Sequence, residues 1–407
     1  MKQLIHYIQE SYENEMLKLS GEDKETLIKL DDEYGELMLI ARYETVVREI
    51  SNKEEEFEKF KKSYIENHEI YYPVIKYREL QYEKYDLKNR AEKLVHKFSN
   101  FNCFLSKYYI ENLNGVLSKI TYLENLDNDD YVYDVAEKLN NFDEALLDKA
   151  KKIIHDEPFH FKHGYMYDRT ITADEAADTI REKLKQLGYD WRIIMREDML
   201  PRMGVNPEKT FRIKPSAKFS KIDIESLIVH EIKAHVAKRY NGYQLGLFLF
   251  VFGLTGKNMF DEGLAIWNTF NMLDTQKPNA MFNIAISYLV CYYCCKYDFC
   301  DAFDKIKELV KNSDYSDFAI FSQMMRSKRS TIRTDRRGYW SGDIDYFRGY
   351  MAVNEMTTEE REKILKYNVG KMQFFELPTI EKFFDINKLE PISSTRLNKI
   401  LKKYTPK

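Results

Sequence analysis

The spacing of apolar residues predicts a mainly helical chain. Leu27, Leu30, Tyr34 and Leu37 recur at helical intervals, and a similar mixture of Glu, Lys, Tyr and Leu continues to about residue 154. Turn-forming or polar residues interrupt this pattern near positions 20–21, 72–73 and 126–131. We therefore expect several separate helices in this part of the chain rather than one long coiled coil.

The pattern changes after residue 155. Apolar and polar residues alternate over 191–196 and again over 203–213, where Asn206-Pro207 marks a turn, so we expect a small antiparallel sheet. Most of the chain after residue 220 has helical spacing again. The expected fold class is α+β and predominantly helical, with an N-terminal helical region over residues 1–155 and a second domain over residues 156–407.

Composition narrows the class of protein. Apolar residues make up 44% of the 407 residues and charged residues 32%, which is typical of a globular protein. A net charge of -3 gives the chain no overall electrostatic attraction to nucleic acid, so we expect no nucleic-acid partner. The most apolar stretches, 243–254 and 282–295, are shorter than the roughly 20 residues of a membrane-spanning helix, so we expect buried helices and no membrane partner. The N-terminus lacks a signal-peptide pattern, and five cysteines, four of them within 291–300, favour a reducing, cytoplasmic setting.

One predicted helix carries a pattern of metal ligands. The run His230-Glu231-x-x-x-His235 is one residue longer than the common His-Glu-x-x-His motif. Positions five apart on a regular α-helix differ by about 140°, so the two imidazoles could not face one ion. A π-bulge, with its i→i+5 hydrogen bond, would bring them back to one face. We therefore predict a widened helical turn between His230 and His235.

A third ligand is expected because catalytic zinc usually binds three protein side chains. Glu262 is the candidate, and the glycine that follows it, Gly263, would let a neighbouring backbone approach closely. Two imidazoles and a carboxylate suit one zinc ion per chain best, although the spacing leaves manganese and iron open. Glu231 would then be the catalytic general base, taking a proton from the attacking water and passing it to the leaving amine. The alternative is a chance pattern in which both histidines are structural.

Several segments together resemble a known family. They are Met203-Gly204-Val205, Lys218-Phe219-Ser220, Leu227 to His235 and Glu262-Gly263-Leu264-Ala265. Over roughly residues 165–385 the chain resembles the microtubule-associated tyrosine carboxypeptidase family of zinc metallopeptidases, as a bacterial-type member whose substrate is left open. The resemblance implies that His230, His235 and Glu262 match the zinc ligands and Glu231 the catalytic glutamate. It also implies removal of a C-terminal residue, tyrosine or another aromatic, from a peptide or protein tail.

A carboxypeptidase also has to bind the terminal carboxylate of its substrate, for which arginine is the natural partner. The segment 326–348 is rich in arginine, and Arg333, Arg337 and Arg348 are the candidates, together with the neighbouring Arg336. Tyr346 would donate a hydrogen bond to the oxyanion of the reaction, as could Tyr350. The alternative for each charged residue is a solvated loop.

Two further clusters and one further function stay open. Cys291, Cys294 and Cys295 could be a second metal site, but buried free thiols are favoured on so apolar a helix. His155, His160 and His163 lack a periodic scaffold, so a loop is favoured over a metal site.

The alternative to a peptidase is a non-catalytic zinc protein whose helical region binds or regulates a partner. Glu231 separates the two functions, because a structural site needs no acid–base group beside its first histidine.

Overall fold

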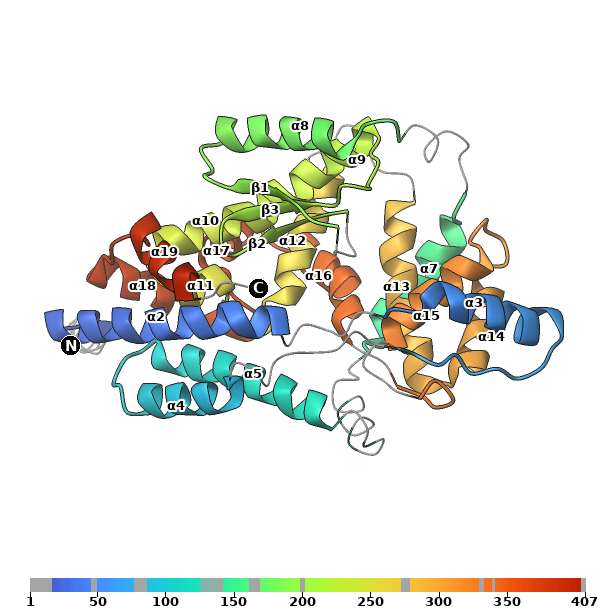
Figure 1. Ribbon diagram of the computed structural model, residues 1–407, viewed down its shortest axis with the longest axis horizontal. Helices are drawn as coiled ribbons and strands as arrows, with labels where there is room; N and C mark the ends of the chain where they lie inside the picture. Colours follow the sequence, from blue (N-terminus) through green and yellow to red (C-terminus); the bar gives the residue numbers. More distant parts are fainter. Residues whose placement is uncertain are drawn as a thin grey trace, which may run out of the picture.

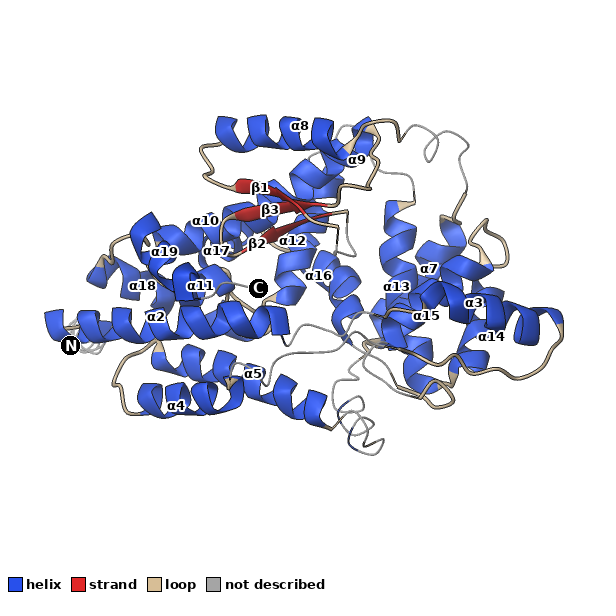
Figure 2. Cartoon of the chain, in the orientation of Figure 1, coloured by secondary structure: helices blue, strands red, loops and turns tan. Residues whose placement is uncertain are grey.

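Helices dominate the structure, and three short strands form one sheet (Figure 2). The computed structural model describes residues 17–44, 50–76, 86–125, 128, 131, 135, 142–160, 169–197, 202–271, 279–328, 333–338 and 341–403. The predicted class, α+β and predominantly helical, is confirmed.

Two hydrophobic cores divide the helices into a larger and a smaller lobe (Figure 1). The larger lobe contains the sheet and the helices α2 (Gly21–Glu44), α4 (Leu87–Ser99), α5 (Ser106–Glu124), α8 (Ala173–Gln186), α9 (Lys221–Leu227), the π-helical segment Ile228–Val236, α10 (Ala237–Gln244), α11 (Phe248–Phe252), α12 (Asn258–Asn271), α17 (Thr358–Tyr367), the 3-10 turn Met372–Glu376, α18 (Leu377–Asn387) and α19 (Ser394–Lys403). The smaller lobe contains α3 (Lys53–Phe60) with the π-helical segment Lys61–Glu66, α7 (Glu144–Asp156), α13 (Ala280–Lys296), α14 (Phe299–Leu309) and α15 (Asp317–Lys328).

The helix α16 (Ile344–Asn354), which follows the 3-10 turn Ser341–Asp343, connects the lobes because its apolar residues enter both cores. Each core also combines helices from before and after residue 155: α2, α4 and α5 pack in the larger lobe, and α3 and α7 pack in the smaller one. The division into residues 1–155 and 156–407 stays a prediction. Burial of apolar surface across that boundary nevertheless ties the two regions together in both lobes.

The sheet contains β1 (Arg192–Met195), β2 (Met203–Asn206) and β3 (Thr210–Ile213) in the order β1-β3-β2. β2 and β3 form the predicted antiparallel hairpin around Pro207. β1, however, pairs parallel to β3, so the prediction of a purely antiparallel sheet is wrong for this strand. Alternation of apolar residues indicates which face of a strand is buried, but it does not indicate which edge of a hairpin receives a third strand.

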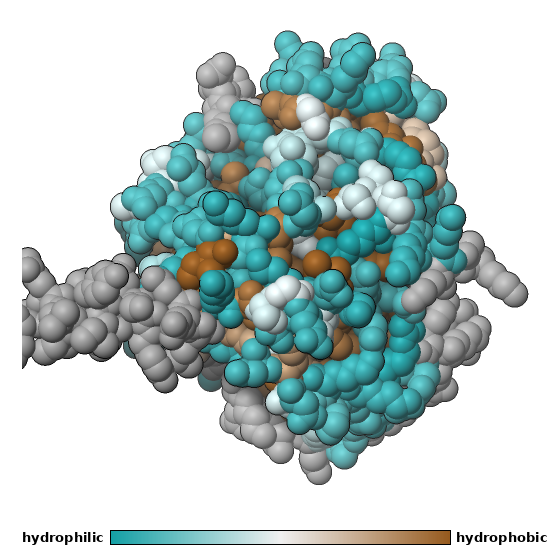
Figure 3. Space-filling view, turned by 90° about the vertical axis from the view of Figure 1, so that its left-hand side faces the viewer, coloured by the Kyte–Doolittle hydropathy of each residue, from teal (hydrophilic) through white to brown (hydrophobic). Residues whose placement is uncertain are grey.

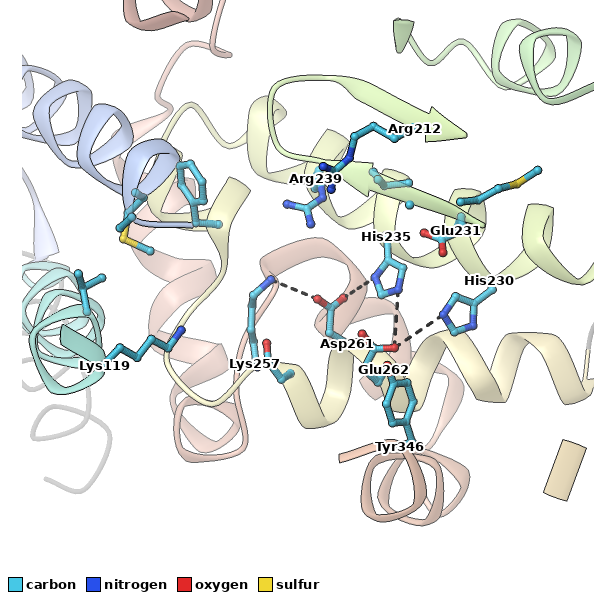
Figure 4. A pocket seen from close by; sticks show the side chains of 18 residues that line it. Lys119, Arg212, His230, Glu231, His235, Arg239, Lys257, Asp261, Glu262 and Tyr346 are labelled. Atoms are coloured by element: carbon cyan, nitrogen blue, oxygen red, sulfur yellow. Dashed lines mark hydrogen bonds and ion pairs between the residues drawn. The ribbon is translucent and has the colours of Figure 1, made fainter. Parts of the chain in front are cut away.

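Two glycines allow α12 and α16 to cross with their backbones in contact. A Cβ atom on Gly263 would lie 2.3 Å from the carbonyl carbon of Gly349, and one on Gly349 would lie 1.9 Å from the carbonyl oxygen of Met259. Glycine is required at such a close approach because any side chain would overlap the opposing helix. The crossing brings Glu262, next to Gly263, towards Tyr346 at the start of α16 (Figure 4).

The two apolar stretches are buried, as predicted. Residues 248–252 form α11, and residues 282–295 lie within α13 at the centre of the smaller lobe. Among the described residues, no helix has the length and apolar character needed to cross a bilayer. Figure 3 shows the end of the larger lobe, where polar residues predominate and apolar residues appear as small, separate patches between them.

Candidate functional site

The histidine motif lies on one continuous helix formed by α9, the π-helical segment and α10. Ser220 caps its first turn, accepting a hydrogen bond from the backbone N–H of Asp223, whose side chain bonds back to the Ser220 N–H. The π-helical segment Ile228–Val236 contains both histidines, which confirms the predicted widened turn. The ring centroids of His230 and His235 lie 5.2 Å apart. The unusual spacing in the sequence therefore still directs both rings to the same side.

Glu262 on α12 meets the two histidines (Figure 4). Its Oε2 atom lies 3.7 Å from Nε2 of His230 and 3.9 Å from Nε2 of His235, and one ligand atom from each residue lies within 4.8 Å of the others. A tetrahedral ion with bonds of about 2.1 Å separates its ligand atoms by roughly 3.4 Å, so small side-chain movements would bring them to bonding distance. The group can hold a metal ion, and no other group of this kind is found among the described residues.

The surroundings of His235 fit metal binding. Its Nδ1 atom lies 3.1 Å from Oδ1 of Asp261, a hydrogen bond that leaves the lone pair on Nε2 available towards Glu262. Asp261 also accepts hydrogen bonds of 3.1 Å from both Lys238 and Lys257. Burial alone would raise the pKa of Asp261, but the charges of Lys238, Lys257 and His235 together outweigh it and hold that pKa well below its usual range. A fixed anion therefore orients the second histidine, as carboxylates do behind metal-binding imidazoles.

A cavity of about 470 Å³ contains the whole group together with Glu231. The residues that line it come from before and after residue 155: Met38, Ala41, Val116, Lys119, Met203, Gly204, Val205, Arg212, His230, Glu231, His235, Arg239, Phe252, Lys257, Asn258, Asp261, Glu262 and Tyr346. The wall formed by α2 and α5 was not foreseen, because helical spacing alone does not show which helices meet across a cavity.

Tyr346 is the one predicted substrate-binding residue that lines this cavity. The charge of Glu262, together with burial, raises the pKa of Tyr346, so its phenol keeps its proton and can donate a hydrogen bond. Arg326 lies over the Tyr346 ring, 5.8 Å from its centroid, and is held in turn by Asp343 at 2.8 and 3.0 Å. This neighbour fixes the tyrosine beside the candidate ligands.

The predicted arginines lie elsewhere. Arg333 is exposed and donates a hydrogen bond to Asp335 at 2.9 Å, while Arg336 and Arg337 are exposed and Arg348 is half-buried on α16. None of the four is among the residues that line the cavity. Their role in substrate binding therefore stays a prediction.

Four cations that were not predicted do line the cavity: Lys119, Arg212, Arg239 and Lys257. The position of Arg239 could have been predicted from the sequence, because it follows His235 by four residues and so lies on the same face of the helix. Arg212 lies between Phe211 and Ile213, so alternation places it on the opposite face of its strand. Only the folded chain shows that this face borders the histidines.

The other clusters have no metal-site geometry among the described residues. Cys291, Cys294 and Cys295 are free thiols buried in α13, as favoured. His155 and His160 are exposed, and His163 lies outside the described residues.

Fold and site together define a class: a mainly helical α+β protein in which a widened His-Glu helix and a glutamate on a crossing helix form a group able to hold a metal ion. The family follows from comparison with known proteins. The family model for microtubule-associated tyrosine carboxypeptidase matches residues 58–400, and the chain belongs to this family. Membership indicates a peptidase, and the match begins well before the region of the resemblance noted above. Among curated proteins, no significant match is found.

Proposed function

We propose that the protein is a zinc-dependent metallopeptidase that removes the C-terminal residue of a peptide or protein tail. The convergence of His230, His235 and Glu262 in a cavity that also contains Glu231 carries this proposal. Three side-chain ligands with room for a fourth are typical of catalytic rather than structural zinc sites. Membership of a carboxypeptidase family supports the same conclusion.

His230, His235 and Glu262 would hold one zinc ion per chain. Its Lewis acidity would polarise the scissile carbonyl group and lower the pKa of the attacking water. The hydrogen bond from His235 to Asp261 would keep that ring in one orientation and one tautomer during the reaction.

The proton transfers fall to Glu231. Its carboxylate borders the same cavity and follows His230 directly in the chain, so it can accept a proton from the attacking water and deliver it to the leaving amine. Tyr346 faces the same space, and its hydroxyl can donate a hydrogen bond to the oxyanion that forms on the substrate carbonyl. Arg326 would act only by positioning this tyrosine.

The apolar part of the cavity supports an aromatic C-terminal residue in the substrate. Met38 of α2, Val116 of α5 and Phe252 of α11 are among the residues that line it, and apolar surfaces accommodate a ring by burying apolar area. The preference for tyrosine or another aromatic residue therefore stays part of the proposal, and the physiological substrate is a peptide or protein tail of this kind.

A mixed peptide library tests the proposal. Incubation with zinc-loaded protein should remove single C-terminal residues, aromatic ones fastest, as read by mass spectrometry. A chelator should stop the reaction, and excess zinc should restore it. Cleavage well inside the peptides would refute the carboxypeptidase but leave the peptidase. No cleavage by fully loaded protein would refute the peptidase and favour a non-catalytic zinc protein.

A further inference from the structure

Two arginines that line the cavity have no partner for their charge among the residues that the structure describes. Arg239 on α10 is only 7% exposed, and its Nε atom is buried without a hydrogen-bond partner. The Nε atom of Arg212 on β3 is buried in the same way. Neither side chain forms a hydrogen bond or an ion pair with any described residue. Figure 4 shows both reaching into the cavity from the strand and the helix drawn above His235.

Three other partly buried cations of this protein are paired with carboxylates. Lys238 and Lys257 both bond to Asp261, and Arg326 bonds to Asp343. Removing a guanidinium from water without a partner costs several kcal/mol, and folded chains normally avoid it. The cost at Arg212 and Arg239 would be offset if an anion entered the cavity and completed the pairing.

The chemistry of the two side chains defines that anion. Guanidinium groups offer only donors, arranged as planar forks that match the two oxygens of a carboxylate. Arg239 follows His235 by four residues, about 6 Å along the helix, whereas one extended residue spans about 3.6 Å. A carboxylate held there would lie within one or two residues of a peptide bond placed at the candidate ligands.

We propose that Arg212 and Arg239 form the receptor for the free C-terminal carboxylate of the substrate and thereby select the last peptide bond. The inference rests on the proposed function and assigns its exopeptidase specificity to two residues. An acidic side chain near the end of the substrate carries the same chemical group, so the test separates the two sources.

Binding to the Glu231→Gln protein tests the receptor without turnover. Three fluorescent peptides of equal length are compared: one with a free C-terminus, one amidated, and one amidated with glutamate as its penultimate residue. The free acid should bind at least about thirtyfold more tightly than either amide, because an amidated end leaves the arginines unpaired. Arg212→Gln and Arg239→Gln should each abolish most of this difference. Arg192→Gln, an exposed arginine on β1, is the matched control and should preserve it.

Thermal unfolding separates a receptor role of Arg239 from a purely structural role, because the two roles predict different changes in Tm. Arg239→Gln should leave the Tm of the ligand-free protein unchanged or higher, because it removes an unpaired buried charge. The free-acid peptide should raise the Tm of the parent protein, and it should leave the Tm of the Arg239→Gln variant unchanged. A lowered Tm with unchanged peptide preference would overturn the receptor.

The outcome is independent of hydrolysis. Repeating the binding in chelator keeps the arginines but removes the metal, so a preference for the free acid should persist there even if the chain cleaves nothing. The receptor is overturned if both arginine variants discriminate between free acid and amide as strongly as the parent. It is equally overturned if the penultimate glutamate, rather than the terminus, determines affinity.

Discussion

At the scale of single residues, the proposed general base is Glu231. Glu231→Gln keeps the shape of the side chain but cannot accept the proton of water, so we expect zinc content unchanged and hydrolysis reduced about a hundredfold or more. Glu225→Gln, an exposed glutamate one helical segment earlier, is the control and should have full activity. Rapid turnover by zinc-loaded Glu231→Gln would transfer the role of general base to another group.

In the proposed mechanism, Asp261 would act through His235 rather than on the substrate. Asp261→Asn removes the anion that orients this histidine and leaves the buried Lys238 without its counter-charge, so the affinity for zinc should fall about 10–100-fold. Competition with a coloured chelator measures that affinity directly. Asp174→Asn, on the surface of α8, should leave it unchanged. Equal affinities in both variants would exclude a positioning role for Asp261.

Residue patterns in the sequence predicted the group that can hold a metal ion but only part of its surroundings. His230, Glu231, His235 and Glu262 were identified because a metal site requires few residue types at fixed spacings. Arg212 could not be identified in this way, since an arginine on one face of a strand has no function visible before the fold brings that face to the cavity.

At the scale of elements, the close crossing of α12 and α16 controls where Tyr346 lies relative to Glu262. Gly349→Ala would push these helices apart, so we expect a loss of about 1–3 kcal/mol of stability from overpacking and a clear fall in kcat/KM. Urea unfolding and peptide hydrolysis measure the two effects. Gly115→Ala in α5 has open space around it and should stabilise slightly. Normal stability of Gly349→Ala would contradict the backbone contact.

Secondary-structure elements could be predicted where interactions between residues close in the sequence determine them. The widened turn over Ile228–Val236 followed from the geometry of two imidazoles that must face one ion. The direction in which β1 pairs did not follow, because the seven-residue connection before β2 is long enough to reach either edge of the hairpin.

At the scale of the whole molecule, Asp31 joins the first and last described helices. Buried in α2, it accepts hydrogen bonds of 2.7 Å from Arg396 on α19 and of 2.8 and 3.1 Å from the backbone N–H groups of Phe248 and Leu249. Asp31→Asn should lower the free energy of unfolding by about 3 kcal/mol or more, because it leaves Arg396 poorly compensated. Asp32→Asn removes a more exposed partner of the same arginine and should cost less than about 1 kcal/mol. Similar losses in urea unfolding would refute the central role of Asp31.

The cavity itself is a property of the whole chain. Met38 and Val116 reach it from helices that helical spacing assigned to an N-terminal region, whereas the candidate ligands lie beyond residue 229. Contacts between such distant segments depend on how complete helices pack, and a single sequence contains no direct signal for them. For this reason the candidate metal ligands were predictable from the sequence, and the cavity wall formed by α2 and α5 was not.

Metal content tests the central claim most directly. Elemental analysis of the purified chain, after dialysis against metal-free buffer, should find one zinc ion per molecule in the parent protein and in Glu231→Gln. His235→Ala should retain almost none, because a ligand is lost while the fold is otherwise kept. A parent protein that holds no stoichiometric metal when zinc is supplied, or a His235→Ala variant that binds zinc as tightly as the parent, would contradict the account.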